Sequence, residues 1–123
     1  MATYRGSCHC GAIRYEATGE LLDLEVCNCS ICVRTGYVHW SIDPADFRLE
    51  TPWSEIATYR FGTGSAKHHF CRICGISAFR ISRSEPEKIT VNVRCLEGVE
   101  LGSLEVGHFD GIHWEEEMAR RGH

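Results

Sequence analysis

The sequence has no long apolar run, no apolar leader and no excess of positive charge. None of its 123 residues lies in a stretch approaching 18 apolar residues, which argues against a membrane-spanning helix. The opening MATYRGSCHC lacks the apolar segment of a secretory signal, so we expect a cytoplasmic protein. The formal net charge of −4 gives no support for nucleic-acid or anionic-membrane binding. Repeats, low-complexity tracts and linkers are also absent, and residues 1–123 are expected to form a single domain.

Cysteine, in contrast, is abundant, with eight residues in this short chain. In a secreted protein such a number would indicate disulfides. The missing signal and the tight clustering instead favour metal ligation in a compartment where thiols stay reduced. Only Cys95 stands apart, and the other seven form three groups: Cys8 and Cys10; Cys27, Cys29 and Cys32; Cys71 and Cys74.

Short β-prone segments follow one another along most of the chain. The segment AIRYEAT (12–18) alternates, which places Ile13, Tyr15 and Ala17 on one face of a half-buried strand. Asp110 is a suitable N-cap for a short helix in the following GIHWEEEMARR. The pattern predicts a mainly β protein with a C-terminal helix. Further strands are expected at 24–27, 37–42, 54–61, 67–71, 76–82, 88–94 and 101–109.

Two cysteine pairs, Cys8 with Cys10 and Cys71 with Cys74, indicate a closed zinc site. CRICG (71–75) has the C-x2-C spacing of a zinc knuckle, followed by a glycine that suits a tight turn. In CHCG (8–11) the thiols lie about 6.6 Å apart along an extended chain, and a turn at Gly11 would bring them within the roughly 4 Å that zinc requires. Cys8, Cys10, Cys71 and Cys74 are therefore predicted to be structural zinc ligands; buried free thiols are the alternative.

The third group, CNCSIC (27–32), places an odd number of thiols in one loop. Catalytic zinc typically has three protein ligands and an exchangeable fourth position, and Cys27, Cys29 and Cys32 match that count. Alternatively, a fourth ligand closes a second structural site. The candidates for this ligand are Cys95, His39, His68 and His69. Spacing alone does not decide between an open and a closed second site.

Three thiolates favour sulfur chemistry over hydrolysis. Zinc with three thiolates carries a formal charge of −1 and is a poorer Lewis acid than zinc held by three neutral imidazoles. A thiol that reaches the fourth position is deprotonated by coordination and becomes nucleophilic. The expected reaction is addition of that thiolate to a small electrophile, or the reverse cleavage of a carbon–sulfur bond.

Three segments, GSCHCGAIRYE, CNCSIC and HFCRICGISAFR, together resemble the glutathione-dependent formaldehyde-activating enzyme family. CNCSIC, FCRICG, CLEG and FDGIHWEEEM are most similar to its centromere protein V-like branch. The resemblance covers about residues 5–119. It differs from many enzyme-like members at Asn28, between the first two cysteines of the middle motif, and at Val33, after the third.

This resemblance implies an Mss4-like fold of several small coiled β-sheets around zinc, with two Zn²⁺ per chain. It implies that Cys8, Cys10, Cys71 and Cys74 hold the structural zinc and that Cys27, Cys29 and Cys32 hold the catalytic zinc. It also implies a carbon–sulfur lyase of the S-(hydroxymethyl)glutathione synthase type, with a small thiol such as glutathione and a small carbonyl compound such as formaldehyde as partners. A non-catalytic two-zinc binding module is the alternative, because thiols add to formaldehyde unaided.

Several polar residues are candidates for supporting roles. An anionic thiol would need a cationic anchor, and Arg34, two residues after the third cysteine of CNCSIC, is favoured over Lys67 and Arg94; a solvated surface charge is the alternative for each. His39, or one of His68 and His69, could orient a ligand or act as a general base. Because adjacent strand residues face opposite ways, at most one of His68 and His69 would face a given site.

Overall fold

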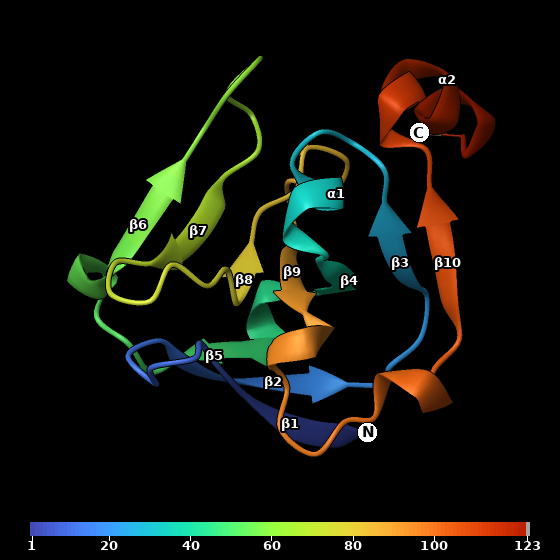
Figure 1. The fold of residues 1–123 in the computed structure, drawn as a ribbon. Helices are drawn as coiled ribbons and strands as arrows, with labels where there is room; N and C mark the ends of the chain where they lie inside the picture. The colour runs from blue at the N-terminus through green and yellow to red at the C-terminus, as the bar shows by residue number, and fades with distance from the viewer. Residues whose placement is uncertain (123) are drawn as a thin grey trace.

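Three small β-sheets form the framework of the computed structural model, which describes residues 1–122 (Figure 1). His123, the last residue of the predicted domain, lies outside the described residues. The alternation predicted for residues 12–18 is confirmed, because Ile13, Tyr15 and Ala17 are buried and Arg14 is exposed. The first sheet is antiparallel, in the order β1–β2–β5, and contains β1 (Ala2–Ser7), β2 (Arg14–Gly19) and β5 (Phe47–Leu49).

The second sheet is the largest and has the strand order β10–β3–β4–β9–β8. Neighbouring strands are antiparallel except β10, which runs parallel to β3. Val38, Trp40 and Ile42 alternate along β4 and are all buried. The strands of this sheet are β3 (Leu24–Cys27), β4 (Val38–Ile42), β8 (Phe79–Arg80), β9 (Ile89–Asn92) and β10 (Val106–Phe109).

The third sheet is a hairpin of β6 (Ile56–Tyr59) and β7 (His68–Cys71), which projects at one side of the molecule (Figure 1). An isolated two-stranded hairpin is marginally stable in water. This one is tied to the second sheet by a β-bridge between Lys67 and Ile81. Its last residue, Cys71, belongs to the predicted zinc knuckle, so a metal at that point would secure the base of the hairpin.

The two α-helices are short: α1 (Cys32–Thr35) follows β3, and α2 (Trp114–Arg120) lies at the C-terminal end (Figure 1). No helix within residues 1–122 is long and apolar enough to cross a membrane. The connections contain 3-10 helices η1 (Pro44–Asp46), η2 (Trp53–Glu55), η3 (Val93–Cys95), η4 (Leu101–Ser103) and η5 (Gly111–His113).

One core joins the sheets. The rings of Tyr15 and Phe47 lie 5.0 Å apart, and those of Phe47 and Phe79 lie 5.0 Å apart. The buried Tyr15 hydroxyl donates a hydrogen bond to the Ala78 carbonyl at 2.9 Å, which satisfies its polar group. The prediction of a mainly β fold of several small sheets with a short C-terminal helix is therefore confirmed.

Four of the predicted strands are markedly shorter than expected. In 88–94, β9 ends at Asn92 and η3 takes the last residues. In 54–61, η2 occupies the start, because Pro52 leads into a tight turn before β6. In 76–82, the Ile76 carbonyl accepts from the Cys71 backbone N–H and closes the knuckle, so β8 begins only at Phe79. In 101–109, η4 takes the first residues and β10 begins at Val106.

The start of the C-terminal helix also differs from the prediction. The helical segment does begin after Asp110, but its first turn is η5, and the Asp110 carboxylate makes no capping hydrogen bond. That carboxylate instead accepts from Asn28 and His113, and the Asp110 backbone N–H donates to Glu117 at 2.9 Å. A long-range bond from Asn28 and two bonds within the C-terminal segment thus replace the N-cap bond that the sequence suggested.

Candidate metal centres

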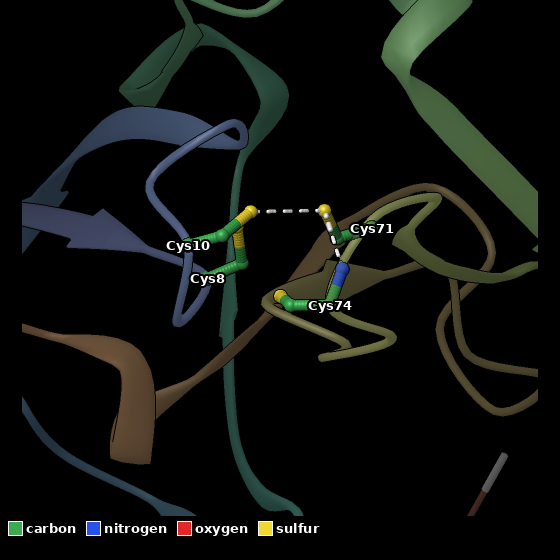
Figure 2. Close-up of side chains that lie close together, drawn as sticks. All are labelled: Cys8, Cys10, Cys71 and Cys74. Atoms are coloured by element: carbon green, nitrogen blue, oxygen red, sulfur yellow. Dashed lines mark hydrogen bonds between the residues drawn. The ribbon is translucent and has the colours of Figure 1, made fainter.

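The four-cysteine cluster brings together Cys8, Cys10, Cys71 and Cys74, as the sequence predicted. Their sulfur atoms all lie within 4.8 Å of one another. The Cys8 and Cys10 sulfurs are 3.7 Å apart, and those of Cys10 and Cys71 are 3.6 Å apart. Figure 2 shows the two pairs pointing toward each other from separate loops.

Two similar turns present these sulfurs. A glycine in the left-handed region directly follows the second cysteine of each pair, with φ of +83° at Gly11 and +79° at Gly75. The Cys8 backbone N–H donates to the Ile13 carbonyl at 3.1 Å, just as that of Cys71 donates to the Ile76 carbonyl at 3.0 Å. A side chain other than glycine would strain either turn. The turns need glycine because the chain must reverse sharply beside the ligands.

The donor set of this cluster fits zinc. Tetrahedral zinc with bonds of about 2.3 Å places its sulfurs somewhat under 4 Å apart, which is the separation of Cys10 from Cys8 and from Cys71. Backbone N–H groups point at two of the sulfurs, from Ile13 to Cys8 at 3.2 Å and from Ile73 to Cys71 at 3.3 Å. Such bonds favour the thiolate form, which is the form that binds a metal. The site could therefore hold a zinc ion with no further ligand.

The cysteine trio, Cys27, Cys29 and Cys32, converges from one short segment. Cys27 is the last residue of β3, Cys29 lies in the following turn and Cys32 begins α1. Their sulfurs lie within 4.8 Å of one another. Gly36 ends α1 at φ +65° and donates its N–H to the Cys32 carbonyl at 3.0 Å, so the helix stops after one turn. Three convergent sulfurs suit one metal ion with a further coordination position.

The C-terminal segment packs against one side of the trio. The Asn28 side chain donates to Asp110 at 3.0 Å and accepts from the Ile112 backbone N–H at 3.0 Å. Gly111 approaches so closely that a Cβ atom there would lie 2.5 Å from the Cys27 sulfur. The trio is thus local in its ligands, but residues more than 80 positions away complete its surroundings.

An open cleft of about 1210 Å³ includes the trio in its lining. One wall is the tip of the β6–β7 hairpin, including Phe61 and Ser65, and another is the C-terminal segment, including Gly111 and Trp114. His39, His68 and Arg80 also line the cleft. A small molecule therefore has a route to the trio.

A family model described as glutathione-dependent formaldehyde-activating enzyme matches residues 3–108. The chain belongs to this family. The matched region contains all seven clustered cysteines, so the two metal centres lie inside the family domain. Membership implies an enzyme that activates formaldehyde in a glutathione-dependent way.

A solved structure supports the same relationship. The crystal structure of a Rhodobacter sphaeroides protein, a structural genomics target, is 40% identical in sequence and superposes with a TM-score of 0.78. The alignment covers 85% of this chain and 98% of that chain. The predicted family resemblance is therefore confirmed, for the fold as well as for the motifs.

The pKa shifts of the trio thiols in this family member favour binding of a cation. Contacts with the Cys27 and Cys32 thiols hold the pKa of Cys29 well below its usual range. Hydrogen bonds with Cys27 and Cys29, together with burial, raise the pKa of Cys32. Three adjacent thiolates repel one another, so full ionisation of the trio is unfavourable without a cation. A divalent cation removes that repulsion and allows all three sulfurs to ionise.

None of the four residues considered as a fourth zinc ligand converges with all three sulfurs of the trio in the described structure. Within residues 1–122, the group of potential ligands around Cys27, Cys29 and Cys32 includes no further histidine, cysteine or carboxylate. Burial raises the pKa of the Cys95 thiol to about 11, which suits a packed thiol. His39 comes nearest, with its Nε2 atom 3.8 Å from the Cys32 sulfur, but Arg80 donates to this Nε2 atom.

The two adjacent histidines face opposite ways, as predicted. Nδ1 of His68 lies 3.3 Å from Nη1 of Arg80, beside the trio. Nδ1 of His69 lies 2.8 Å from the Thr58 hydroxyl, and the His69 ring packs against Trp53 at 5.2 Å. Burial lowers the pKa of both residues to about 4, so both are neutral at pH 7.

Two of the three candidate anchors bind the backbone around α1. Arg34 donates to the Ser30 carbonyl at 2.7 Å, and Arg94 donates to the Gly36 carbonyl at 2.7 Å. The backbone of Lys67 forms the bridge to Ile81. The Arg34 side chain is exposed next to the trio but is not among the residues that line the cleft.

Sequence reasoning missed Arg80 and Gly111. Arg80 is only 4% exposed and donates to the Cys32 sulfur at 2.9 Å. Its position in AFRI, between apolar neighbours on a predicted strand, was the available signal. Gly111 had no local signal, because its closeness to Cys27 depends on the pairing of β10 with β3.

Proposed function

We propose that the chain is a zinc-dependent carbon–sulfur lyase or synthase of the S-(hydroxymethyl)glutathione synthase type. The supporting observation is the cysteine trio: three sulfurs converge in an open cleft, and no fourth potential ligand converges with all three in the described part of the chain. In this proposal residues 1–123 act as one domain with two zinc ions. Its dependence on free thiols suits the reducing cytoplasm.

Cys8, Cys10, Cys71 and Cys74 would hold a structural zinc, and Cys27, Cys29 and Cys32 a catalytic one. A zinc ion on the trio would supply a position at which a thiol loses its proton at neutral pH. Three thiolate ligands suit this role better than the activation of water, because they leave the metal a weak Lewis acid. The substrates would be a small thiol such as glutathione and a small carbonyl compound such as formaldehyde.

The reaction balances without a redox partner. The thiol S–H bond breaks and its proton passes to solvent, and a new bond forms between sulfur and the carbonyl carbon. The π electron pair of the C=O bond moves to oxygen, which takes a proton from water in the open cleft. The reverse sequence cleaves the carbon–sulfur bond. Arg34 is the proposed anchor for a carboxylate of the thiol, since its exposed guanidinium lies two residues beyond Cys32.

Exchange kinetics test this function. The rate at which formaldehyde and glutathione interconvert with their adduct is measured by exchange NMR, with the uncatalysed rate subtracted. We expect the zinc-loaded protein to accelerate the exchange. Cys29→Ser should keep the four-cysteine zinc and the fold, and its rate should fall to the uncatalysed value.

Cys95→Ala is the matched control, because Cys95 belongs to neither cluster. It should retain two zinc ions and the full rate. If neither the parent nor Cys29→Ser accelerates exchange above the uncatalysed rate, the chain is a non-catalytic two-zinc module. If Cys29→Ser loses one zinc but accelerates exchange as the parent does, the trio is not the catalytic site.

A further inference from the structure

Arg80 is a buried cation in direct contact with the trio. It lies on β8, is only 4% exposed, and donates from Nη2 to the Cys32 sulfur at 2.9 Å. Its guanidinium carbon also lies 4.3 Å from the centre of the Tyr37 ring. A guanidinium removed from water in this way requires a compensating negative charge.

No carboxylate within residues 1–122 supplies that charge. None of the ion pairs formed within residues 1–122 includes Arg80. The Nε atom of Arg80 is buried and has no hydrogen-bond partner in the same region. A structural arginine would normally be paired through its planar fork with an acid.

The other polar neighbours of Arg80 are neutral. Arginine has no acceptor atom, so His39 Nε2 and His68 Nδ1 must each accept from its N–H groups. His39 then carries its proton on Nδ1, which donates to the Glu25 carbonyl at 3.1 Å. A histidine that accepts from Arg80 cannot be doubly protonated. Among the groups in contact with the guanidinium, the Cys32 sulfur is the one that can carry a negative charge.

We propose that Arg80 is the counter-charge of the cysteine trio and a positioning residue that favours binding of an anionic thiolate substrate. Zinc with three thiolates has a formal charge of −1, and Arg80 makes the loaded site neutral. A substrate thiolate then raises the total negative charge to one instead of two. The second half of this inference rests on the proposed function, whereas the effect on metal binding does not.

The hydrogen bond from Arg80 to Cys32 also favours binding of a substrate thiolate. It withdraws electron density from one ligand, so the trio donates less strongly and the metal retains more affinity for a further thiolate. Metal binding also requires Cys32 to be a thiolate, and the adjacent guanidinium stabilises that anion. Loss of Arg80 should therefore weaken metal binding to the trio, and it should raise the apparent pKa at which an added thiol binds. Outer contacts of this kind typically change metal affinity by about 10- to 100-fold.

Arg80→Met and Arg80→Lys test the proposal, and Arg72→Met is the matched control. Arg72 is also next to metal ligands, but it is exposed and donates to the Ser54 carbonyl at 3.0 Å. Zinc affinity of each cluster is measured by competition with a chelator. In Arg80→Met, affinity at the trio should fall about 10- to 100-fold while the four-cysteine cluster is unchanged. Arg80→Lys should recover part of the loss, and Arg72→Met should show none at the trio.

Cobalt substitution separates this inference from the proposed function. Thiol binding to the cobalt-loaded trio is followed by absorption as a function of pH, and Arg80→Met should shift the midpoint upward. If the parent protein binds no thiol, the proposed function fails, and the chelator competition still decides whether Arg80 supports the metal. Unchanged zinc affinity at the trio in a folded Arg80→Met would overturn the inference.

A measurement on the unaltered protein covers the case in which the Arg80 variants do not fold. With ¹¹³Cd in both clusters, a guanidinium proton of Arg80 should show scalar coupling to the cadmium bound by Cys32, through the N–H···S hydrogen bond. A slowly exchanging, assigned Arg80 proton without such coupling would show that the bond to the metal-bound sulfur is absent, and the proposal would be wrong.

Discussion

The four-cysteine cluster and the cysteine trio use the same ligand type but are built in opposite ways. The first takes one pair of sulfurs from each of two segments that are 61 residues apart between Cys10 and Cys71. The second takes all its sulfurs from one segment of six residues. A metal in the first cluster would therefore close a long loop and add to folding stability. A metal on the trio would add little to the fold, and it would lie in the cleft, where a small molecule can reach it.

The residues that surround the two clusters also differ. The four-cysteine cluster is held by backbone N–H groups and two left-handed glycines. The trio segment contacts a buried arginine and the C-terminal segment around Gly111. The four-cysteine cluster takes its ligands from distant segments, but the backbone groups that support it are close to those ligands in the sequence. The trio takes its ligands from one segment, but the residues that support it are far away in the sequence.

Ligand removal should separate the two clusters most strongly. Cys71→Ser removes a fully buried ligand that joins the hairpin to the first turn, and we expect the free energy of unfolding to fall by more than about 4 kcal/mol. Cys29→Ser should lose one zinc and retain a cooperative thermal transition. Thermal unfolding followed by circular dichroism, with metal analysis, provides the measurement. Equal destabilisation by the two variants would remove the distinction between a structural and a reactive site.

A methyl group at Gly111 should damage the trio selectively. Gly111→Ala places Cβ 2.5 Å from the Cys27 sulfur and 2.9 Å from the Cys29 Cβ, so the ligands must shift. We expect the zinc content to fall from two ions to one, with the four-cysteine zinc retained. Gly102→Ala is the control, because its added Cβ meets nothing within 4 Å. Two zinc ions in Gly111→Ala would show that the C-terminal segment moves aside at no cost to the site.

The link between the trio and the C-terminal segment should have a moderate effect. Asn28→Ala removes the bonds to Asp110 and to the Ile112 N–H, and each is expected to contribute about 1 kcal/mol. Chemical denaturation should show a decrease of about 1–2 kcal/mol. Asp110→Ala removes the bond between Asn28 and Asp110 but leaves the bond from the Ile112 N–H to Asn28 in place. It therefore removes only one of the two bonds that Asn28 makes. If Asn28→Ala is neutral, the close packing of Gly111 rather than this link holds the segment.

The smallest expected effect is the pH dependence of stability that the C-terminal segment contributes. The hydrogen bond and charge of Asp110 raise the pKa of His113 above its usual 6.5. Its contribution to stability is therefore fully present below pH 6.5 and is lost as pH rises through the elevated value. Since both side chains are largely exposed, solvent screens the pair and the change is small.

An NMR titration of the His113 ring measures this shift. Asp110→Asn should return the midpoint to about 6.5, because the carboxylate charge is removed. The same midpoint in the parent and in Asp110→Asn would show that the pair does not form in solution.

Local patterns predicted most of the ligand geometry. The C-x-C-G and C-x2-C-G spacings indicated turns that need glycine, and both glycines do adopt positive φ. The alternation in 12–18 indicated which residues enter the core, since a strand has a period of two. Strand lengths were predicted less well, because the knuckle bond to Ile76 and the turn after Pro52 compete with strand pairing.

The cysteine pattern along the chain was enough to predict one cluster of four cysteines and one of three, because ligand identity and spacing are local properties. The surroundings of the trio depend instead on long-range strand pairing. The pairing of β10 with β3 brings Gly111 to Cys27, and the pairing of β8 with β9 in the same sheet positions Arg80 beside Cys32. These contacts join residues 48 or more positions apart, and no local spacing encodes them.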